Sequence, residues 1–263
     1  MFLTSLQPGA TAENAPPACL AAQGVEARIV RVIDSHTVET ATGQLVRLAA
    51  IEAPNSIIAT ASGKNIGLIK RARNLLTKLT LNKKVLLVFD AGKPDRYNRQ
   101  RAHILVSSPG RNTRAWVQGE MIARGMARAF PNTSEAVCFK PLLEIEKSAR
   151  SKKTGLWKNR FYRVIAAENL KTLNRSLGRL QLIEGRVHSV AVRRTRIYIN
   201  FSADWRRDFT VTLNPRTYRL FAQSGIIIKD LTNRIIRTRG WLGRHNGPTI
   251  KVNHVAQIEI LKD

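Results

Sequence analysis

Acidic residues are scarce in this chain of 263 residues, which carries 18 aspartates and glutamates against 44 lysines and arginines. The formal net charge is therefore +26 at pH 7. Both halves of the chain share the excess, so no single basic tail accounts for it. A basic surface of this size attracts polyanions by releasing their counterions, and nucleic acid is the commonest polyanion. A surface that is basic only for solubility is the alternative interpretation.

The chain also has few cysteines and no long apolar segment. The two cysteines, Cys19 and Cys138, form no Cys-x-x-Cys pair, which argues against a structural zinc site. No stretch approaches the roughly 18 uncharged apolar residues of a membrane span, so the sequence predicts no transmembrane helix. Hydrophobic residues make up 43% of the chain, which argues against disorder. That content suffices for one large core or two modest ones.

The first 24 residues are rich in alanine and proline and lack a basic segment. Residues 10–12, Ala-Thr-Ala, have the small-x-small form of a signal-peptidase site. One interpretation is the remnant of a longer signal peptide, which predicts an exported bacterial protein, periplasmic or secreted. The other is an ordinary flexible tail, which leaves a cytoplasmic location open.

Residues 25–160 combine predicted strands with predicted helices. Short apolar segments between turns predict strands at 27–33, 37–40, 45–51, 84–89 and 102–106. Helical spacing and terminal glycines predict helices at 66–81, 115–124 and 134–153. This order of elements indicates an α+β domain built on a small barrel.

The pattern changes after residue 160. Residues 161–180 are polar and weakly patterned, which predicts a linker or a bridging helix. Residues 181–263 carry six predicted strands and one short helical piece at 217–223. Short antiparallel strands with one helix suit a second, small β-barrel of the oligonucleotide-binding (OB) type. The predicted fold is therefore α+β and mainly β, with two barrel domains.

Four segments of the first domain occur in a specific order. They are Val32–Val38, Val46–Asn55, Asp95–Arg99 and Gly155–Trp157. Together they resemble the thermonuclease (staphylococcal-nuclease-like) family across residues 25–160. The resemblance implies a five-stranded OB-fold barrel with three helices. The second domain resembles an additional OB-like barrel found in some bacterial members.

The active members of this family hold a calcium ion with aspartates, bind the scissile phosphate with two arginines and activate water with a glutamate. The resemblance assigns the arginine positions to Arg47 and Arg99, and metal-ligand positions to Asp34 and Glu52. These residue types suit the chemistry, because hard cations prefer carboxylate oxygens and guanidinium groups bind phosphate through paired donors.

Two positions depart from the family pattern. His36 stands where a principal calcium-binding aspartate is expected, and Asn55 stands where the water-activating glutamate is expected. Asparagine has no useful basicity, and general-base assistance contributes about 10² to 10⁴ in rate, so the usual mechanism should be crippled. Calcium binding should be weakened as well. His36 with Asp34 and Glu52 would suit Mn²⁺ or Zn²⁺ better, although a solvated turn histidine is the preferred interpretation.

Three functions stay open. The first is a nucleic-acid-binding protein with a degraded catalytic site that binds the phosphate backbone without sequence specificity. The second is a weak or active metal-dependent phosphodiesterase that acts on DNA or RNA. The third is a protein-interaction scaffold. Enzyme activity is thus undecided at this stage.

Aromatic residues interleaved with arginines predict a surface for a single strand, because bases stack on rings while cations follow the phosphates. The candidates are Tyr97 in the first domain and Tyr198, Trp205, Arg194 and Arg196 in the second. Single-stranded DNA or RNA is the expected partner, and a monomer is the expected state.

The two cysteines lie at points of the first domain that could meet. Cys19 comes just before the first predicted strand, and Cys138 lies in the last predicted helix. A Cys19–Cys138 disulfide is therefore our hypothesis, and it depends on export to an oxidising compartment.

Overall fold

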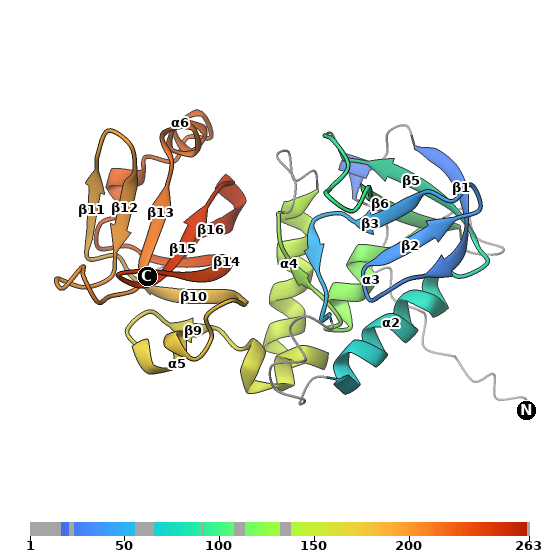
Figure 1. Ribbon diagram of the computed structural model, residues 1–263, viewed down its shortest axis with the longest axis horizontal. Coiled ribbons are helices and arrows are strands. Elements are labelled where there is room, and N and C mark those ends of the chain that lie inside the picture. The colour runs from blue at the N-terminus through green and yellow to red at the C-terminus, as the bar shows by residue number, and fades with distance from the viewer. Residues whose placement is uncertain are drawn as a thin grey trace, which may run out of the picture.

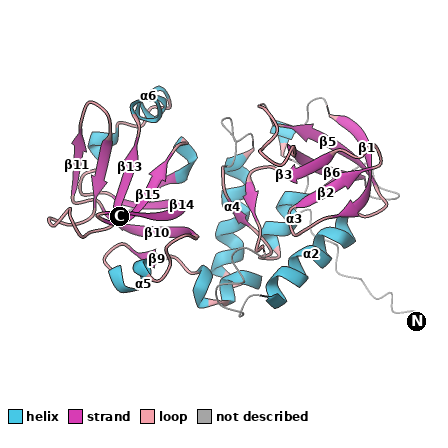
Figure 2. Cartoon of the chain, in the orientation of Figure 1, coloured by secondary structure: helices cyan, strands magenta, loops and turns pink. Residues whose placement is uncertain are grey.

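The computed structural model describes residues 17–20, 24–55, 66–90, 92–107, 114–131 and 138–261. The suggested signal-peptidase site lies outside these residues. Two curled sheets lie side by side, with helix α4 (Phe139–Ser151) between them (Figure 1). Strands form both sheets, and the longer helices gather around the first one (Figure 2). Among the described residues, none of the helices has the length and apolar character that crossing a membrane requires.

The first sheet closes into a barrel of five strands. They pair in the order β3-β2-β1-β5-β6, and pairing of β3 with β6 closes the ring. The strands are β1 (Val25–Val32), β2 (Thr37–Thr40), β3 (Leu45–Leu48), β5 (Lys84–Phe89) and β6 (Gln100–Ser107). Fully buried Ile29, Val46, Leu87 and Ile104 belong to its core. The closed barrel confirms the predicted OB-like, α+β fold.

Three helices pack around the barrel, in agreement with the sequence prediction. They are α2 (Ile66–Thr80), α3 (Val117–Ala123) and α4. Helix α2 buries Leu68, Ala72 and Leu76, whose spacing of four places them on one face. Helix α3 begins later than predicted. Residues 115 and 116 belong instead to strand β7 (Arg114–Trp116), where Trp116 pairs with Leu105 of β6.

The predicted strand 45–51 is divided at Ala50, whose φ of 58° turns the chain out of the barrel. The turn starts a separate strand, β4 (Ile51–Glu52), which pairs with β8 (Arg128–Ala129) in a small sheet of its own. This departure matters for the site below, because it places Glu52 outside the barrel wall.

The second sheet is curled but is not a closed barrel. Its strands pair in the order β11-β12-β13-β15-β14-β10-β9, with β16 beside β14. Within the described part of the chain, no pairing joins β11 to β9, so the sheet is a half-barrel where the sequence predicted a complete one. The strands are β9 (Ile165–Ala166), β10 (Leu180–Arg186), β11 (Ser189–Val192), β12 (Ile197–Asn200), β13 (Thr210–Leu213), β14 (Ile235–His245), β15 (Gly247–Val252) and β16 (Ile258–Ile260). Helix α6 (Pro215–Gln223) covers the predicted helical piece.

Within the predicted linker or bridging helix, residues from 165 on pack with the second sheet, whereas Tyr162 is buried in a cluster with side chains of the first domain. Strand β9 pairs with β10, and helix α5 (Leu170–Asn174) follows it. Ile165 and Leu173 are buried in the core of the second sheet. The few apolar side chains of a polar segment thus suffice to fix it there.

Strand β14 presents two faces to two different partners. Ile236 and Leu242 belong to the core of the second sheet. Side chains alternate along a strand, so Arg237, Arg239 and Trp241 lie on the opposite face. That face is turned toward the first barrel, because Arg239 contacts helix α4.

Arg239 joins the two sheets through a buried ion pair. Its side chain and that of Glu146 on α4 are each 1% exposed, and its Nη1 lies 2.9 Å from the Glu146 carboxylate. The same nitrogen donates to the carbonyl of Ala129 on β8, and Nη2 donates to Glu259 on β16. Burial lowers the pKa of Arg239, but the carboxylates of Glu146 and Glu259 outweigh it and raise the pKa above its ordinary value. Arg239 is therefore charged.

A disulfide joins Cys19 to Cys138, whose Cα atoms are 5.7 Å apart. It ties the turn at Ala18–Leu20 to the residue that precedes α4. The pairing proposed from the sequence is thus present in the structure.

Opening this disulfide should destabilise the protein. The bond spans a sequence separation of 119 residues and restricts the unfolded chain. We expect the Cys19→Ser/Cys138→Ser variant to lose roughly 2 to 5 kcal/mol of unfolding free energy in urea titrations. Reductant should shift the wild-type midpoint toward that of the variant and leave the variant unchanged. Identical wild-type midpoints with and without reductant would contradict the prediction.

Removing Arg239 should have a large effect, because it leaves the Glu146 carboxylate buried without its main partner. We expect Arg239→Met to cost about 3 to 5 kcal/mol in urea unfolding. The matched control is Arg31→Met, which breaks an ion pair with Glu39 in which the arginine is 65% exposed. That change should cost less than about 1 kcal/mol. Equal losses in the two variants would show that the buried pair does not hold the sheets together.

Candidate functional site

A cavity of about 650 Å³ lies where the β1–β2 turn, β3, β4 and the loop before β6 meet. Seven residues singled out from the sequence line it together: Asp34, His36, Arg47, Glu52, Asn55, Tyr97 and Arg99. The structure therefore assembles the first-domain candidates into one site, although they come from three separate segments of the chain.

Asp34 shapes the turn that opens this site. Its carboxylate accepts the backbone N–H of His36 at 2.8 Å and the hydroxyl of Thr37 at 3.2 Å. Aspartate commonly stabilises a turn in this way. Strand pairing then places Thr37 opposite Arg47 on β3. The turn and the register together fix the position of Arg47 beside His36.

Arg47 is held between two buried side chains. It donates to Nε2 of His36 at 3.0 Å and to a carboxylate oxygen of Glu52 at 2.5 Å. His36 is 3% exposed and Glu52 is 5% exposed. His36 is thus not the solvated turn residue that we expected from the sequence. Its ring accepts a hydrogen bond from Arg47 and lies inside the protein.

Burial shifts the pKa of both partners of Arg47. Burial, aided by the charge of Arg47, lowers the pKa of His36 to about 4, so its imidazole is neutral at pH 7. Burial raises the pKa of Glu52, and Arg47 and Arg128 partly offset that effect. A neutral histidine can accept the hydrogen bond from Arg47, whereas a charged one would repel the guanidinium.

Arg99 is anchored separately from Arg47. Its Nε and Nη2 both donate to Asp95, at 2.9 and 2.7 Å, and its Nη1 donates to the hydroxyl of Thr37 at 3.1 Å. Burial alone would raise the pKa of Asp95. The hydrogen bonds from Arg99 and from the backbone of Arg99 and Tyr97 lower it to about 2. Asp95 is therefore ionised and fixes the guanidinium of Arg99 beside Thr37.

The carboxylates of this site accept hydrogen bonds from neighbouring groups of the protein. Both oxygens of Asp34 accept hydrogen bonds within the turn. The two oxygens of Glu52 accept from Arg47 and from the amide of Asn55, the latter at 3.2 Å. The Nε2 lone pair of His36 faces Arg47. Within the described residues there is no group of three or more histidine, cysteine, aspartate or glutamate side chains that could hold a metal ion.

Cationic groups predominate around the cavity. Four arginines line it, Arg47, Arg73, Arg96 and Arg99, against the carboxylates of Asp34 and Glu52. Tyr97 is exposed, and the guanidinium carbons of Arg96 and Arg99 lie 4.8 and 5.0 Å from the centre of its ring. This arrangement can bind an anion such as phosphate and presents an aromatic ring beside it.

Sequence reasoning missed Arg73 and Phe130, which line the cavity, and it grouped Trp241 only with the aromatic residues of the second domain. Arg73 lies on α2 and donates to the carbonyl of Val32. A helical arginine carries no local signal of such a role. Trp241 comes from the second sheet, so only the relative placement of the two sheets reveals it. Arg96 lies within the segment Asp95–Arg99, which did point to the site.

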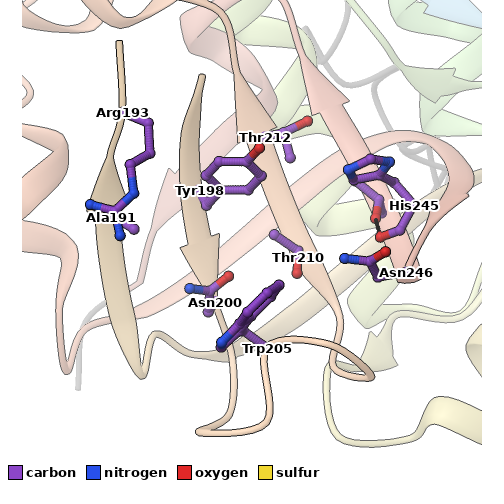
Figure 3. A pocket seen from close by; sticks show the side chains of 10 residues that line it. Ala191, Arg193, Tyr198, Asn200, Trp205, Thr210, Thr212, His245 and Asn246 are labelled. Atoms are coloured by element: carbon purple, nitrogen blue, oxygen red, sulfur yellow. Dashed lines mark hydrogen bonds between the residues drawn. The ribbon is translucent and has the colours of Figure 1, made fainter. Parts of the chain in front are cut away.

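The second-domain candidates lie at a different cavity, of about 320 Å³ (Figure 3). Tyr198 and Trp205 lie between the strand that carries Arg193 and the turn that carries His245 and Asn246. Arg193 lines this cavity, whereas Arg194 and Arg196 are exposed and lie outside its lining. The guanidinium carbon of Arg206 lies 4.4 Å from the centre of the Trp205 ring.

Comparison with protein families matches residues 45–159 to the family described as staphylococcal nuclease homologue. The matched stretch includes Arg47, Glu52, Asn55 and Arg99 and begins after the Asp34 turn. No curated protein matches the chain significantly.

The protonation of His36 should make stability depend on pH. Its folded pKa of about 4 lies below the unfolded value of 6.5, so between these values the unfolded chain binds the extra proton. Stability should be full above pH 6.5 and fall by about 3 kcal/mol as pH drops to 4. Urea titrations across this range should show the slope in wild type and lose it in His36→Gln, which keeps an acceptor for Arg47.

The control for this experiment is His188→Gln, which removes an exposed imidazole and should leave the slope in place. Asp95 acts in another range: its lowered pKa contributes stability that is lost only as pH falls below about 4 toward 2. A slope between pH 4 and 6.5 that persists in His36→Gln would show that His36 is not its source.

Proposed function

Because residues 45–159 are a domain of the staphylococcal nuclease homologue family, we propose that this protein binds the phosphate backbone of nucleic acid without sequence specificity and hydrolyses it weakly or not at all. The observation that carries the proposal is the pair Arg47 and Arg99, which are anchored separately and line one cavity. Preorganised guanidinium groups bind phosphate with little loss of side-chain entropy.

Both arginines keep donors for a ligand. Of the five N–H bonds of a guanidinium group, Arg47 uses two on His36 and Glu52. Arg99 uses three on Asp95 and Thr37. The contacts that position each guanidinium therefore leave it able to donate to phosphate oxygens. The surplus of positive charge around the cavity favours a polyanion over a neutral ligand.

The chemistry of Asn55 supports weak or absent hydrolysis. Its amide cannot accept a proton from water, and it donates to Glu52. Glu52 in turn binds Arg47 and is buried, so it is not free to act as the base. The alternative function, a metal-dependent phosphodiesterase, would show itself as cleavage in the assay below. A protein-interaction scaffold would show no salt-sensitive affinity for nucleic acid.

The second domain adds aromatic groups to this proposal. Tyr198 and Trp205 line one cavity with Arg193, and Arg206 packs over the Trp205 ring. Rings beside cations suit single-stranded DNA or RNA, whose bases are open to stacking. We therefore propose a single-stranded partner for a monomeric protein. These residues would form a second contact with the strand, at a cavity separate from that of Arg47.

The Cys19–Cys138 disulfide supports a location outside the reducing cytosol. An exported protein, periplasmic or secreted, is accordingly our proposal for where it acts.

Arg99→Ala should weaken binding to a single-stranded oligonucleotide by about 10-fold or more, because a charge-assisted contact to phosphate is lost. The slope of log affinity against log salt should also fall by about 1. Fluorescence anisotropy across a salt series measures both quantities. The matched control is Lys171→Ala on α5, which removes one exposed positive charge outside the cavity and should change affinity far less.

The same proteins then decide between binding and cleavage. Single-stranded DNA and RNA are incubated with Ca²⁺, Mn²⁺, Zn²⁺ or EDTA, and Asn55→Glu is added to the set. We expect salt-sensitive binding without efficient cleavage, and activity that appears in Asn55→Glu would identify the missing base. Metal-dependent cleavage by wild type that disappears in Arg99→Ala would overturn the proposal of a retired catalytic site.

A further inference from the structure

Trp241 is the residue through which the second sheet reaches the cavity of Arg47 and Arg99. It lies two residues after Arg239 on β14 and therefore on the same face. Arg239 is fully buried in its ion pair, whereas Trp241 keeps 44% of its surface exposed. A large aromatic ring left half open in a cationic cavity offers a surface on which a base can stack.

A second cavity continues from the first past Trp241. Its volume is about 710 Å³, and Trp241 and Phe130 line both cavities. Residues of the two sheets form its walls, and its basic members are Lys93, Arg101, Arg216, Lys251 and His254. Within the described residues, no aspartate or glutamate lines it. Both cavities lie between the two sheets that Figure 1 shows side by side, and together they make one cationic cleft.

Arg101 connects the two cavities. The parallel pairing of β3 with β6 places it beside Arg47. Paired residues on neighbouring strands project from the same face of a sheet, with backbones about 5 Å apart. Arg47 lines the first cavity and Arg101 lines the second. Within the described part of the chain, the buried Nε of Arg101 has no hydrogen-bond partner, so its N–H is not satisfied by the protein.

We propose that this cleft is the path of a single nucleic-acid strand. Trp241 stacks one base beside the phosphate that Arg47 and Arg99 bind. Arg101, Lys251 and Arg216 bind the phosphates that follow. The inference rests on the proposed function, and it adds that the second sheet completes the binding site and selects single strands.

The stacking contact is what selects a single strand. In a duplex the faces of the bases are covered by their neighbours, so a base can reach Trp241 only after unstacking. A single strand offers its base faces at no such cost. The two cavities, of about 650 and 710 Å³, are also of the size that takes small ligands, which suits a few nucleotides of one strand.

Tryptophan fluorescence tests the stacking directly. Trp116 and Trp157 are buried, whereas Trp205 and Trp241 are exposed. In a Trp205→Phe background, Trp241 is therefore the only exposed tryptophan among the described residues. Titration with an oligothymidylate of about ten nucleotides should quench its emission in proportion to binding, and added salt should reverse the quenching.

Affinity gives a second, independent measurement. We expect Trp241→Ala to weaken oligothymidylate binding roughly 5- to 100-fold, and Trp241→Phe to keep most of the affinity because it keeps a stacking face. Lys251→Ala should lower both affinity and salt dependence, while Lys171→Ala, outside the cleft, should not. Circular dichroism and thermal unfolding confirm that each variant is folded. Duplex DNA of the same length should bind more weakly than the single strand.

The outcomes separate this inference from the function on which it rests. Wild type that binds no oligonucleotide at low salt would overturn both. Wild type that binds with steep salt dependence, but with unquenched Trp241 and full affinity in Trp241→Ala, would overturn the cleft alone. A polyglutamate peptide that binds as tightly, and with the same dependence on Trp241, would assign the cleft to an acidic protein segment and overturn the nucleic-acid path.

Discussion

The buried ion pair between Arg239 and Glu146 holds the strands on which the position of Arg47 depends. Arg239 donates to the carbonyl of Ala129, and Glu146 accepts a hydrogen bond from the backbone N–H of Ala129. The ion pair therefore holds β8 through both backbone groups of one residue. Strand β8 pairs with β4, which carries Glu52, and Glu52 holds Arg47. A chain of direct contacts therefore runs from the junction of the two sheets to Arg47.

The few acidic residues near the junction pair with specific arginines, so the protein can fold and still keep a positively charged surface. Glu146 and Glu259 neutralise an arginine that would otherwise be buried alone. Glu52 and Asp95 each hold one arginine of the cavity in position. Most carboxylates near the junction thus orient guanidinium groups, and the walls of the cleft remain positive. The acidic side chains thus fix the positions of the cavity arginines, and the surplus of arginines and lysines keeps the cleft positively charged.

The sequence predicted what depends on local pattern and order. The barrel and its three helices follow from the periodicity of strands and helices, whereas the gathering of Asp34, Arg47, Asn55 and Arg99 follows from the family resemblance that the ordered segments carry. The sequence could not predict the burial of His36, because that depends on Arg47 and Glu52 approaching from other strands. It also gave no sign of Trp241 in the cavity, because no pattern along a chain states how two sheets face each other.

Strand β14 makes the geometry of this protein sensitive to length more than to composition. Its side chains alternate between the core of one sheet and the junction with the other. An insertion or deletion of one residue before Arg239 would invert the alternation, turning its charged group into an apolar interior and away from Glu146. A substitution at Trp241, which is 44% exposed, leaves this alternation unchanged. The number of residues in β14 is therefore more constrained than the identity of its exposed side chains.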